Sequence, residues 1–287
     1  MSTERHPTTP DTRTDATTFG THALSSWRSG LLRAAQALPA NWFGRRAALL
    51  LRKCVLKGGP RVIDADVEGL HYRLHMRDNV SERKYLFMPQ FFDVYERRLL
   101  RESLRPGDIF VDIGANAGIY SLAAAAAVGA TGRVLAVEPN PRMIERLTLN
   151  LSLNGFLDRA ILEQAAVSDR PGQFELTLDD TNLGGASLLN RGSGASLKVR
   201  CELLTDLLAR HDITRIDALK IDIEGAEDRA LAPFFATAPE ALHPRIIIIE
   251  NSTQDWQQDL PAIFIAAGYR LLRQTRMNLV YQKQSAH

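Results

Sequence analysis

Short apolar runs alternate with stretches of helical periodicity through the second half of the chain. From Asp108 onward the apolar runs are IFVDIG, RVLAVEP, AILEQAAV, IDALKID and RIIIIEN, and helical stretches such as PRMIERLTLNLSLNG separate them. Runs that are apolar throughout suit strands buried on both faces. The pattern therefore predicts an α/β fold with a doubly wound, mostly parallel, Rossmann-like sheet. After the helix LPAIFIAAG, the segment YRLLRQTRMNLVYQK predicts two closing strands that pair antiparallel.

An insertion interrupts this rhythm. FELTLDD and LKVRCELL read as two strands, and TNLGGASLLNRGSGAS between them (residues 181–196) is rich in glycine and serine. We expect an inserted hairpin whose long tip closes over a bound acceptor as a lid.

The first 60 residues are basic. Residues 1–22 are rich in Thr, Pro and charge and lack the apolar core of a signal peptide, so we expect a disordered tail. Residues 23–60 read as a helical extension in which Phe43, Ala47, Leu50 and Cys54 share one stripe. Between Asp15 and Asp64 the chain has no acidic residue; its cations there are Arg28, Arg33, Arg45, Arg46, Arg52, Lys53, Lys57 and Arg61. Two interpretations stay open: a helix docked on the main domain with its basic side in solvent, or a surface that meets anionic lipid or an acidic partner.

Residues 61–105 are predicted to precede the core as a β-hairpin and a helix. RVIDADVEGLHYRLHM alternates like two strands joined at Glu68-Gly69, and His71, Arg73 and His75 would share one face. Two histidines could bind a metal, but no third ligand is evident nearby, so the pattern favours a solvated or substrate-facing polar edge. FFDVYERRLLRESL then reads as an amphipathic helix, and the core domain is predicted over residues 106–287.

The bulk composition narrows the function classes. The 287 residues are 45% hydrophobic, which is ample for a core, and the formal charge of +2 gives no overall field for nucleic acid. The two cysteines, Cys54 and Cys201, lie far apart without CxxC spacing. No apolar run reaches the roughly 20 residues that span a bilayer. We expect a cytoplasmic protein, with peripheral membrane contact if the basic extension binds lipid.

The unit VDIGANAGIYSLAAAAAVGATGRVLAVEPNP resembles a nucleotide-binding strand, turn, helix and strand. A dinucleotide fingerprint requires glycines at relative positions 1, 3 and 6, but from Gly114 these positions hold Asn116 and Ile119. The fingerprint fails, and a phosphate-binding lysine–serine pair is also missing from the unit.

An acid on the first strand, Asp112, and an acid ending the second, Glu138, remain. A carboxylate at the second strand tip can accept both hydroxyls of a ribose. Gly114 and Gly118 would let the backbone approach a ligand closely. With Asp112 near a positive group, the set fits S-adenosylmethionine, which has a ribose, an ammonium and a sulfonium but no phosphate. The alternative is that both acids only cap turns.

Six motifs occur in order: DIGANAGIYSLAAA, GRVLAVEPNP, LNLSLNG, AAVSD, LKIDIEGAE and IIIIEN. Together they resemble the FkbM family of S-adenosylmethionine-dependent methyltransferases, with the seven-stranded class I methyltransferase fold, over about residues 91 to 281. The resemblance implies methyl transfer to a hydroxyl on a sugar, glycan or secondary metabolite. It implies that Glu138 binds the ribose. The residues implied for the methionine part are Asp112, Gly114, Asn116 and Gly118, and those near the adenine are Gln164, Ala165, Ala166 and Val167.

The catalytic centre is predicted from LKIDIEGAE. Parallel strands open their ligand crevice at their carboxyl ends, where this motif delivers Asp222 and Glu224. One of them would accept the hydroxyl proton, and which one is left open. Lys220 is expected to pair with Asp222, whereas Glu227 can be explained by the following helix dipole.

Two other function classes share some of these sequence features. A cofactor-binding module without catalysis is disfavoured by the intact DIGANAG and KIDIEGAE motifs. A nucleic-acid methyltransferase is favoured only by the basic N-terminal window, and the amino-methylating (N/D)PP(Y/F) sequence is absent.

Overall fold

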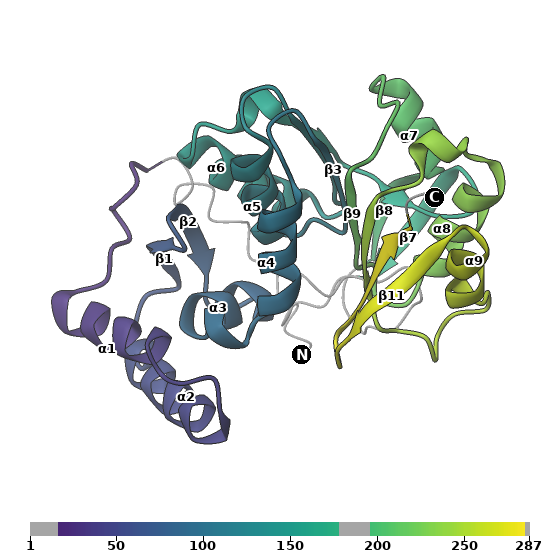
Figure 1. Ribbon diagram of the computed structural model, residues 1–287. Helices are drawn as coiled ribbons and strands as arrows, with labels where there is room; N and C mark the ends of the chain where they lie inside the picture. The colour runs from purple at the N-terminus through teal and green to yellow at the C-terminus, as the bar shows by residue number, and fades with distance from the viewer. Residues whose placement is uncertain (1–16, 178–195, 285–287) are drawn as a thin grey trace, which may run out of the picture.

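A seven-stranded sheet forms the centre of the computed structural model, which describes residues 17–177 and 196–284 (Figure 1). The strand order is β11-β12-β10-β9-β3-β4-β5. Strands β3, β4, β5, β9 and β10 pair in parallel, whereas β12 pairs antiparallel with both β10 and β11. The bounds are β3 Ile109–Ile113, β4 Arg133–Val137, β5 Ala160–Glu163, β9 Ala218–Ile221, β10 Ile246–Glu250, β11 Tyr269–Gln274 and β12 Asn278–Lys283. The predicted parallel sheet and the antiparallel closing pair are therefore confirmed.

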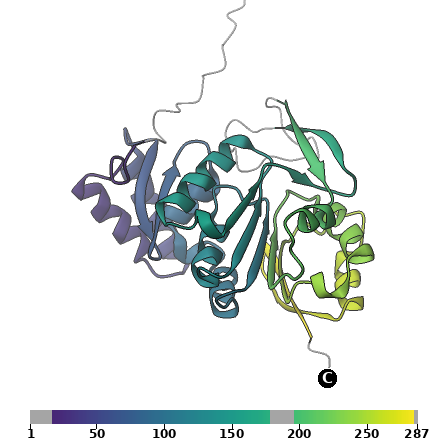
Figure 2. The same ribbon diagram turned by 90° about the horizontal axis from the view of Figure 1, so that it is seen from above.

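Helices cover both faces of this sheet (Figure 2). Alternate residues of one strand point to opposite faces. Phe110 of β3 packs in one core with helices α4, α5 and α6, while Val111 packs in a second core with α7, α8 and α9. The helices are α4 Val94–Ser103, α5 Ile119–Val128, α6 Pro141–Leu153, α7 Leu204–Arg210, α8 Glu227–Thr237 and α9 Leu260–Ala266.

The predicted insertion forms a small second sheet. Strands β7 (Gly172–Thr177) and β8 (Ser196–Glu202) pair antiparallel, and β6 (Ala166–Val167) joins β8 on the other side. The tip of this hairpin, residues 178–195, lies outside the described residues, and the lid predicted there lies outside them too.

The predicted N-terminal hairpin is present, but its polar edge is not solvated as expected. Strands β1 (Val62–Val67) and β2 (Leu70–His75) pair antiparallel around Glu68-Gly69. Arg73 is fully buried, because its guanidinium donates to both carboxylate oxygens of Asp64, at 2.7 and 3.0 Å. Of the three residues expected at the edge, only His71 is exposed.

The same ion pair orders the chain before the first helix. The guanidinium of Arg73 donates to the carbonyls of Thr17 and Thr18, and Asp64 accepts from the backbone N–H groups of Gly20 and His22. Residues 17–22 therefore pack on the hairpin, which differs from the predicted tail over residues 1–22. Residues 1–16 lie outside the described part.

Helices α1 (Ser26–Gln36) and α2 (Trp42–Leu56) form the basic extension, followed by α3 (Val80–Phe87) and the short η1 (Pro89–Phe91). The buried side of α2 consists of Gly44, Ala48 and Val55, whose small or compact side chains let α2 approach its neighbours closely. The stripe that contains Phe43 and Leu50 faces outward instead. Helical spacing identified the stripe correctly, but α2 does not dock through it.

Candidate active site

Three strand ends lie level at the carboxyl edge of the sheet. Ile113 of β3 stands opposite Val137 of β4 on one side and Ile221 of β9 on the other. The residues that follow, Gly114, Glu138 and Asp222, therefore begin three adjacent turns at the same height. This register, which follows from the parallel pairing, brings together polar residues separated by up to about a hundred positions in sequence.

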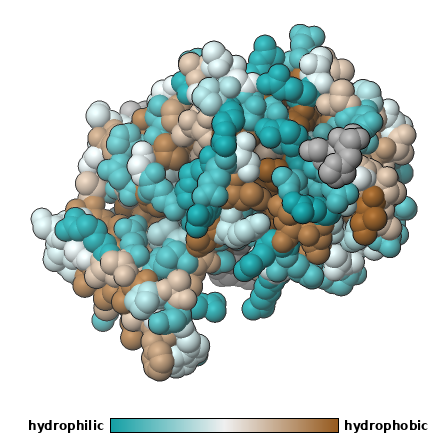
Figure 3. All heavy atoms as spheres, in the orientation of Figure 1, coloured by the Kyte–Doolittle hydropathy of each residue, from teal (hydrophilic) through white to brown (hydrophobic). Residues whose placement is uncertain are grey.

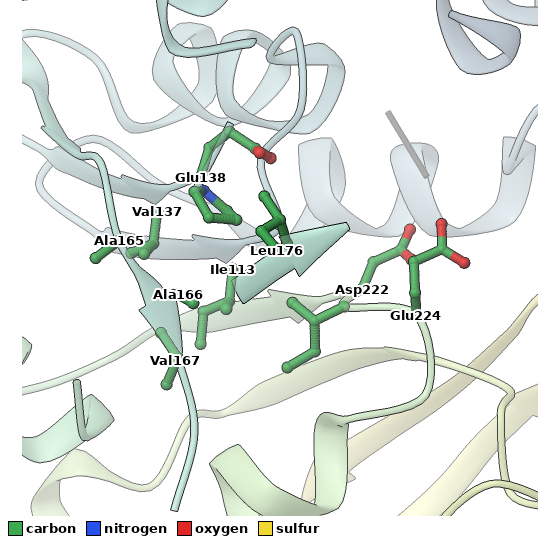
Figure 4. Close-up of a pocket in the computed structure, with 12 residues that line it drawn as sticks. Ile113, Val137, Glu138, Ala165, Ala166, Val167, Leu176, Asp222 and Glu224 are labelled. Atoms are coloured by element: carbon green, nitrogen blue, oxygen red, sulfur yellow. The ribbon is translucent and has the colours of Figure 1, made fainter. Parts of the chain in front are cut away.

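Two adjoining pockets open along this edge. The Glu138 pocket is lined by Ile113, Gly114, Val137, Glu138, Pro139, Ala165, Ala166, Val167, Leu176, Asp222, Ile223 and Glu224 (Figure 4). The Lys220 pocket is lined by Ser81, Phe92, Asp93, Asp112, Gly114, Ala115, Asn116, Ile119, Tyr120, Lys220, Asp222 and Glu224. Gly114, Asp222 and Glu224 belong to both, so they mark the place where the two pockets meet.

Glu138 is almost completely buried, and both of its carboxylate oxygens accept backbone hydrogen bonds. One accepts from the N–H of Asn116 at 2.9 Å and the other from the N–H of Asn140 at 2.8 Å. Burial raises the pKa of Glu138 to about 7, against the opposing effect of these two N–H groups. Each carboxylate oxygen has a second lone pair, so the group can still accept hydroxyls from a ligand in its pocket.

Asp112 has a buried oxygen without a partner in the described structure. Its Oδ2 accepts from the Ser121 hydroxyl at 2.6 Å, but its Oδ1 accepts no hydrogen bond. Burial raises the pKa of Asp112, although the nearby cation Lys220 opposes this. An unsatisfied buried carboxylate oxygen in a pocket wall fits a positively charged ligand group that would occupy it.

Lys220 provides a buried cation in the second pocket. Its Nζ donates to Asp222 Oδ2 at 3.0 Å and lies 4.9 Å from the centre of the Tyr120 ring. Burial opposes the charge, but the carboxylates of Asp222 and Asp112 outweigh it and raise the pKa of Lys220 above its usual value. The predicted pair of Lys220 with Asp222 is thus confirmed, and it fixes the orientation of Asp222.

Asp222 and Glu224 project from the turn that follows β9 (Figure 4). Glu224 has a left-handed backbone with φ 57°, which is uncommon for a residue with a side chain. Glu227 stabilises this turn: its Oε1 accepts from the N–H groups of Ile223 and Gly225 at 2.9 and 3.2 Å. Its Oε2 accepts from Trp256 Nε1 at 2.8 Å. Glu227 therefore does more than meet a helix dipole, because it positions the turn that carries both pocket carboxylates.

Glu250, at the end of β10, lines neither pocket. Its buried Oε2 has no hydrogen-bond partner among the described residues. Burial, followed by repulsion from Asp222, Glu227 and Glu224, raises its pKa to about 8. Four carboxyl groups thus interact electrostatically at the ends of β9 and β10. Among residues 17–177 and 196–284, no group of three or more His, Cys, Asp or Glu side chains could bind a metal ion.

The structure brings together most of the residues predicted for the cofactor. Ala165, Ala166 and Val167 line the Glu138 pocket, but Gln164 is exposed and lines neither pocket. Gly118 also lies outside both pocket linings.

Protein packing also requires both glycines, Gly114 in the lining of both pockets and Gly118 outside them. A Cβ on Gly114 would stand 2.0 Å from the carbonyl oxygen of Asp222, and one on Gly118 would stand 2.4 Å from Leu147 Cδ1. Both also have positive φ, 77° and 92°.

Sequence reasoning missed the outer wall of the Lys220 pocket. Ser81, Phe92 and Asp93 come from the segment before the core domain, and Tyr120 lies in the first turn of α5. Tyr120 follows the GANAG motif closely in sequence, so its position near the site could have been inferred. No pattern in the sequence distinguishes the other three residues.

The seven-stranded sheet, with its order β11-β12-β10-β9-β3-β4-β5, has the class I methyltransferase fold, and the family match that follows makes S-adenosylmethionine its cofactor. The model of the Methyltransferase FkbM domain matches residues 112–282, and the chain belongs to that family.

Two curated proteins illustrate the relationship. The chain is 31% identical to "31-O-demethyl-FK506 methyltransferase FkbM" of Streptomyces tacrolimicus, over 54% of this chain and 69% of that protein. It is 28% identical to "Methyltransferase sdnD" of Sordaria araneosa, over 58% of this chain and 73% of that protein. A solved SAM-dependent O-methyltransferase from Thermotoga maritima is more remote, with 13% identity, a TM-score of 0.43 and 80% of each chain covered.

Proposed function

We propose that this methyltransferase transfers the methyl group to a hydroxyl oxygen of a sugar, glycan or secondary metabolite. One observation carries the proposal: Asp222 and Glu224 are the carboxylates that line both pockets. A group in that position would face the ribose and adenine part of the cofactor in the Glu138 pocket, and both the methionine part and the entering acceptor in the Lys220 pocket. The relative whose name specifies a 31-O-demethyl substrate supports oxygen as the methylated atom.

The cofactor residues are assigned by chemistry. Glu138 would accept the ribose hydroxyls, and the apolar side chains of Ala165, Ala166 and Val167 would contact the adenine. Asp112, with its partnerless Oδ1 in the Lys220 pocket, would accept from the ammonium of the methionine part. When bound, S-adenosylmethionine supplies an electrophilic methyl group. The chain's own contribution is to orient the acceptor and to remove its proton.

Proton removal is assigned to Asp222 or Glu224. An alcohol becomes a better nucleophile when a neighbouring base accepts its proton as the new bond forms. Lys220 holds Asp222 at 3.0 Å, and Glu227 fixes the turn that carries Glu224. Both carboxylates are thus held in place before the acceptor binds, which lowers the entropic cost of alignment.

The walls of the Lys220 pocket favour a hydroxyl-bearing acceptor. Ser81, Asp93 and Tyr120 add hydroxyl and carboxylate groups, and Phe92 adds an aromatic surface. Tyr120 donates its hydroxyl to Asp93 Oδ2 at 3.2 Å, so these two groups are already oriented. Polar groups beside an aromatic ring are typical of sites that bind sugars or oxygenated metabolites.

The test is an incubation of the protein with labelled S-adenosylmethionine and a panel of sugars, glycans and polyketide alcohols, followed by mass spectrometry. We expect a product that carries one added methyl group as an ether, which resists mild alkali. The variant Asp222→Asn/Glu224→Gln should bind S-adenosylhomocysteine and yield no product. Methylation of nitrogen or of a carboxylate would contradict the proposal. Cofactor binding without methylation of any compound in the panel would favour a cofactor-binding module without catalysis.

A further inference from the structure

The α1–α2 hairpin stands at one end of the molecule, away from the central sheet (Figure 1). Its inner side packs through Leu32 and Ala35 of α1 and Ala48 and Val55 of α2, which belong to the larger core. Gln36 Nε2 also donates to the carbonyl of Leu86 in α3 at 2.8 Å. The hairpin is therefore anchored to the rest of the protein, and its outer side is held in a defined orientation.

The outer side of α2 exposes large apolar side chains. Phe43 is 75% exposed, Leu50 63% and Trp42 62%, and Trp27 of α1 is also exposed. Phe43 and Leu50 lie two turns apart on one stripe, and the Trp42 and Phe43 rings contact each other edge to face at 4.8 Å. Figure 3 shows hydrophobic surface over this end of the molecule. Such a group of exposed rings on a hairpin that is otherwise well packed marks an interaction surface.

The segment that contains the hairpin is basic and carries no acidic residue. Residues 16–63 contain eight Lys and Arg and no acid, whereas the whole chain has a net charge of only +2. Over the part of the chain that the structure describes, none of these eight cations forms a salt bridge. Arg46 lies over the Trp42 ring at 5.1 Å and Arg28 over the Trp27 ring at 5.0 Å. An arginine therefore stacks on an exposed tryptophan in each of the two helices.

We infer that the outer side of the α1–α2 hairpin docks on the surface of a bilayer that contains anionic lipids. The indole rings of Trp42 and Trp27 suit the headgroup boundary, and Phe43 and Leu50 can enter the acyl region below it. The Arg and Lys side chains that form no salt bridge within the described residues would bind lipid phosphates. A nucleic acid would satisfy the cations but would leave the aliphatic Leu50 without a partner. No helix among the described residues has the length and apolar character needed to span the bilayer, so the contact would be peripheral.

The hairpin is packed against the segment that supplies the outer wall of the Lys220 pocket. Helix α1 contacts α3, and Ser81 in the first turn of α3 lines the Lys220 pocket. Gln90 Nε2, just before the pocket residues Phe92 and Asp93, donates to the carbonyl of Ala35 at 2.9 Å. The inference itself rests on the hairpin surface alone and stands or falls independently of the proposed O-methylation.

The test uses the full-length protein in co-sedimentation with vesicles of phosphatidylcholine, with and without about one third phosphatidylglycerol. We expect binding to the anionic vesicles, a loss of binding as salt rises, and a blue shift of tryptophan emission on binding. The variant Trp42→Ala/Phe43→Ala/Leu50→Ala should lose the blue shift and most of the binding. The variant Arg45→Gln/Arg46→Gln/Lys53→Gln should weaken partitioning on the order of 100-fold, since each cation contributes separately.

Two controls replace the same number of exposed apolar or basic side chains elsewhere. They are Ile265→Ala/Leu271→Ala/Met277→Ala and Arg98→Gln/Arg170→Gln/Lys198→Gln, at positions that are exposed in the structure. Both should bind vesicles like the wild type, and all four variants should retain S-adenosylhomocysteine affinity as evidence of folding. Failure of the wild type to bind anionic vesicles, or equal loss in controls and test variants, would overturn the inference. So would a stable dimer in solution that the triple alanine variant dissociates, because a second copy would then cover the stripe.

Discussion

Replacing Glu138 by Gln tests the cofactor site with the smallest change in shape. The wild-type carboxylate accepts the N–H of Asn116 with one oxygen and the N–H of Asn140 with the other. A glutamine has a single oxygen, so one of these N–H groups would face an amide that is itself a donor. The charge that favours ribose hydroxyls as donors is also lost.

The expected loss follows from burial. Glu138 is only 6% exposed, so a charge-assisted hydrogen bond from it is poorly replaced by water. Its removal should cost about 1.5 to 3 kcal/mol, or about 10- to 150-fold in the Kd for S-adenosylhomocysteine. The pKa of about 7 adds a pH signature. The ionised Glu138 carboxylate is the better hydrogen-bond acceptor. The wild-type affinity for S-adenosylhomocysteine should therefore strengthen as pH rises through 7 and weaken below it, by up to about tenfold per pH unit.

Calorimetry at several pH values measures both effects. The matched control is Glu163→Gln, the same substitution at the end of the neighbouring strand β5, where the side chain pairs with Arg200 and lines neither pocket. Its affinity should equal that of the wild type. An analogue that lacks both ribose hydroxyls should bind wild type and Glu138→Gln alike, since the partner has already been removed. A folded Glu138→Gln protein with unchanged Kd and the wild-type pH dependence would refute the assignment.

Three other predictions follow from the site. Asp222→Asn and Glu224→Gln, made separately, should each leave S-adenosylhomocysteine affinity within a few-fold of the wild type. At least one of them should lower kcat by about 100-fold or more, because it removes the general base. Normal turnover in both variants would exclude these residues as the base. Glu250 has a pKa of about 8 in the folded protein against 4.5 unfolded, so its deprotonation destabilises the fold as pH rises through this window. Glu250→Gln should therefore raise Tm by several degrees at pH 9 and by little at pH 5, and a constant difference would contradict this. Gly114→Ala should strongly destabilise the folded protein and abolish cofactor binding, because the new Cβ would collide with Asp222. Gly155 also has positive φ but has open space around it, so Gly155→Ala should lower the free energy of unfolding by only about 1 kcal/mol, measured by thermal unfolding.

The sheet and its cofactor edge could be predicted because their signals are local. Apolar runs define buried strands, and a polar residue directly after such a run must lie at the carboxyl edge once the strands are parallel. Glu138 and Asp222 satisfy this rule, and the structure places them in adjoining pockets. Gln164 also follows a strand, but its side chain points to solvent. The rule gives the height of a residue in the sheet and not the direction of its side chain.

The features that could not be predicted depend on tertiary packing. Arg73 alternates with histidines in a way typical of a solvated edge, but its pair with Asp64, helix α6 and residues 17–22 enclose it in the folded protein. Helical spacing marked the Phe43 stripe as apolar, but Gly44 and Ala48 allow the closer helix contact and so decide which side is buried. Ser81 reaches the Lys220 pocket through the packing of helices distant in sequence, which periodicity cannot show.

The contact between Gly114 and the carbonyl of Asp222 separates two parts of the site that can change at different rates during evolution. Gly114 in the turn proposed to bind the cofactor and Asp222 in the turn proposed to bear the catalytic carboxylates are packed without space for even one methyl group, so substitutions in either turn should disturb both. Ser81, Phe92 and Asp93 stand outside this contact, on a segment that can vary in shape while the transfer chemistry is preserved. A library directed at these three positions is the shortest route to a new acceptor range, and a single ancestral scaffold could have served many acceptors by the same means.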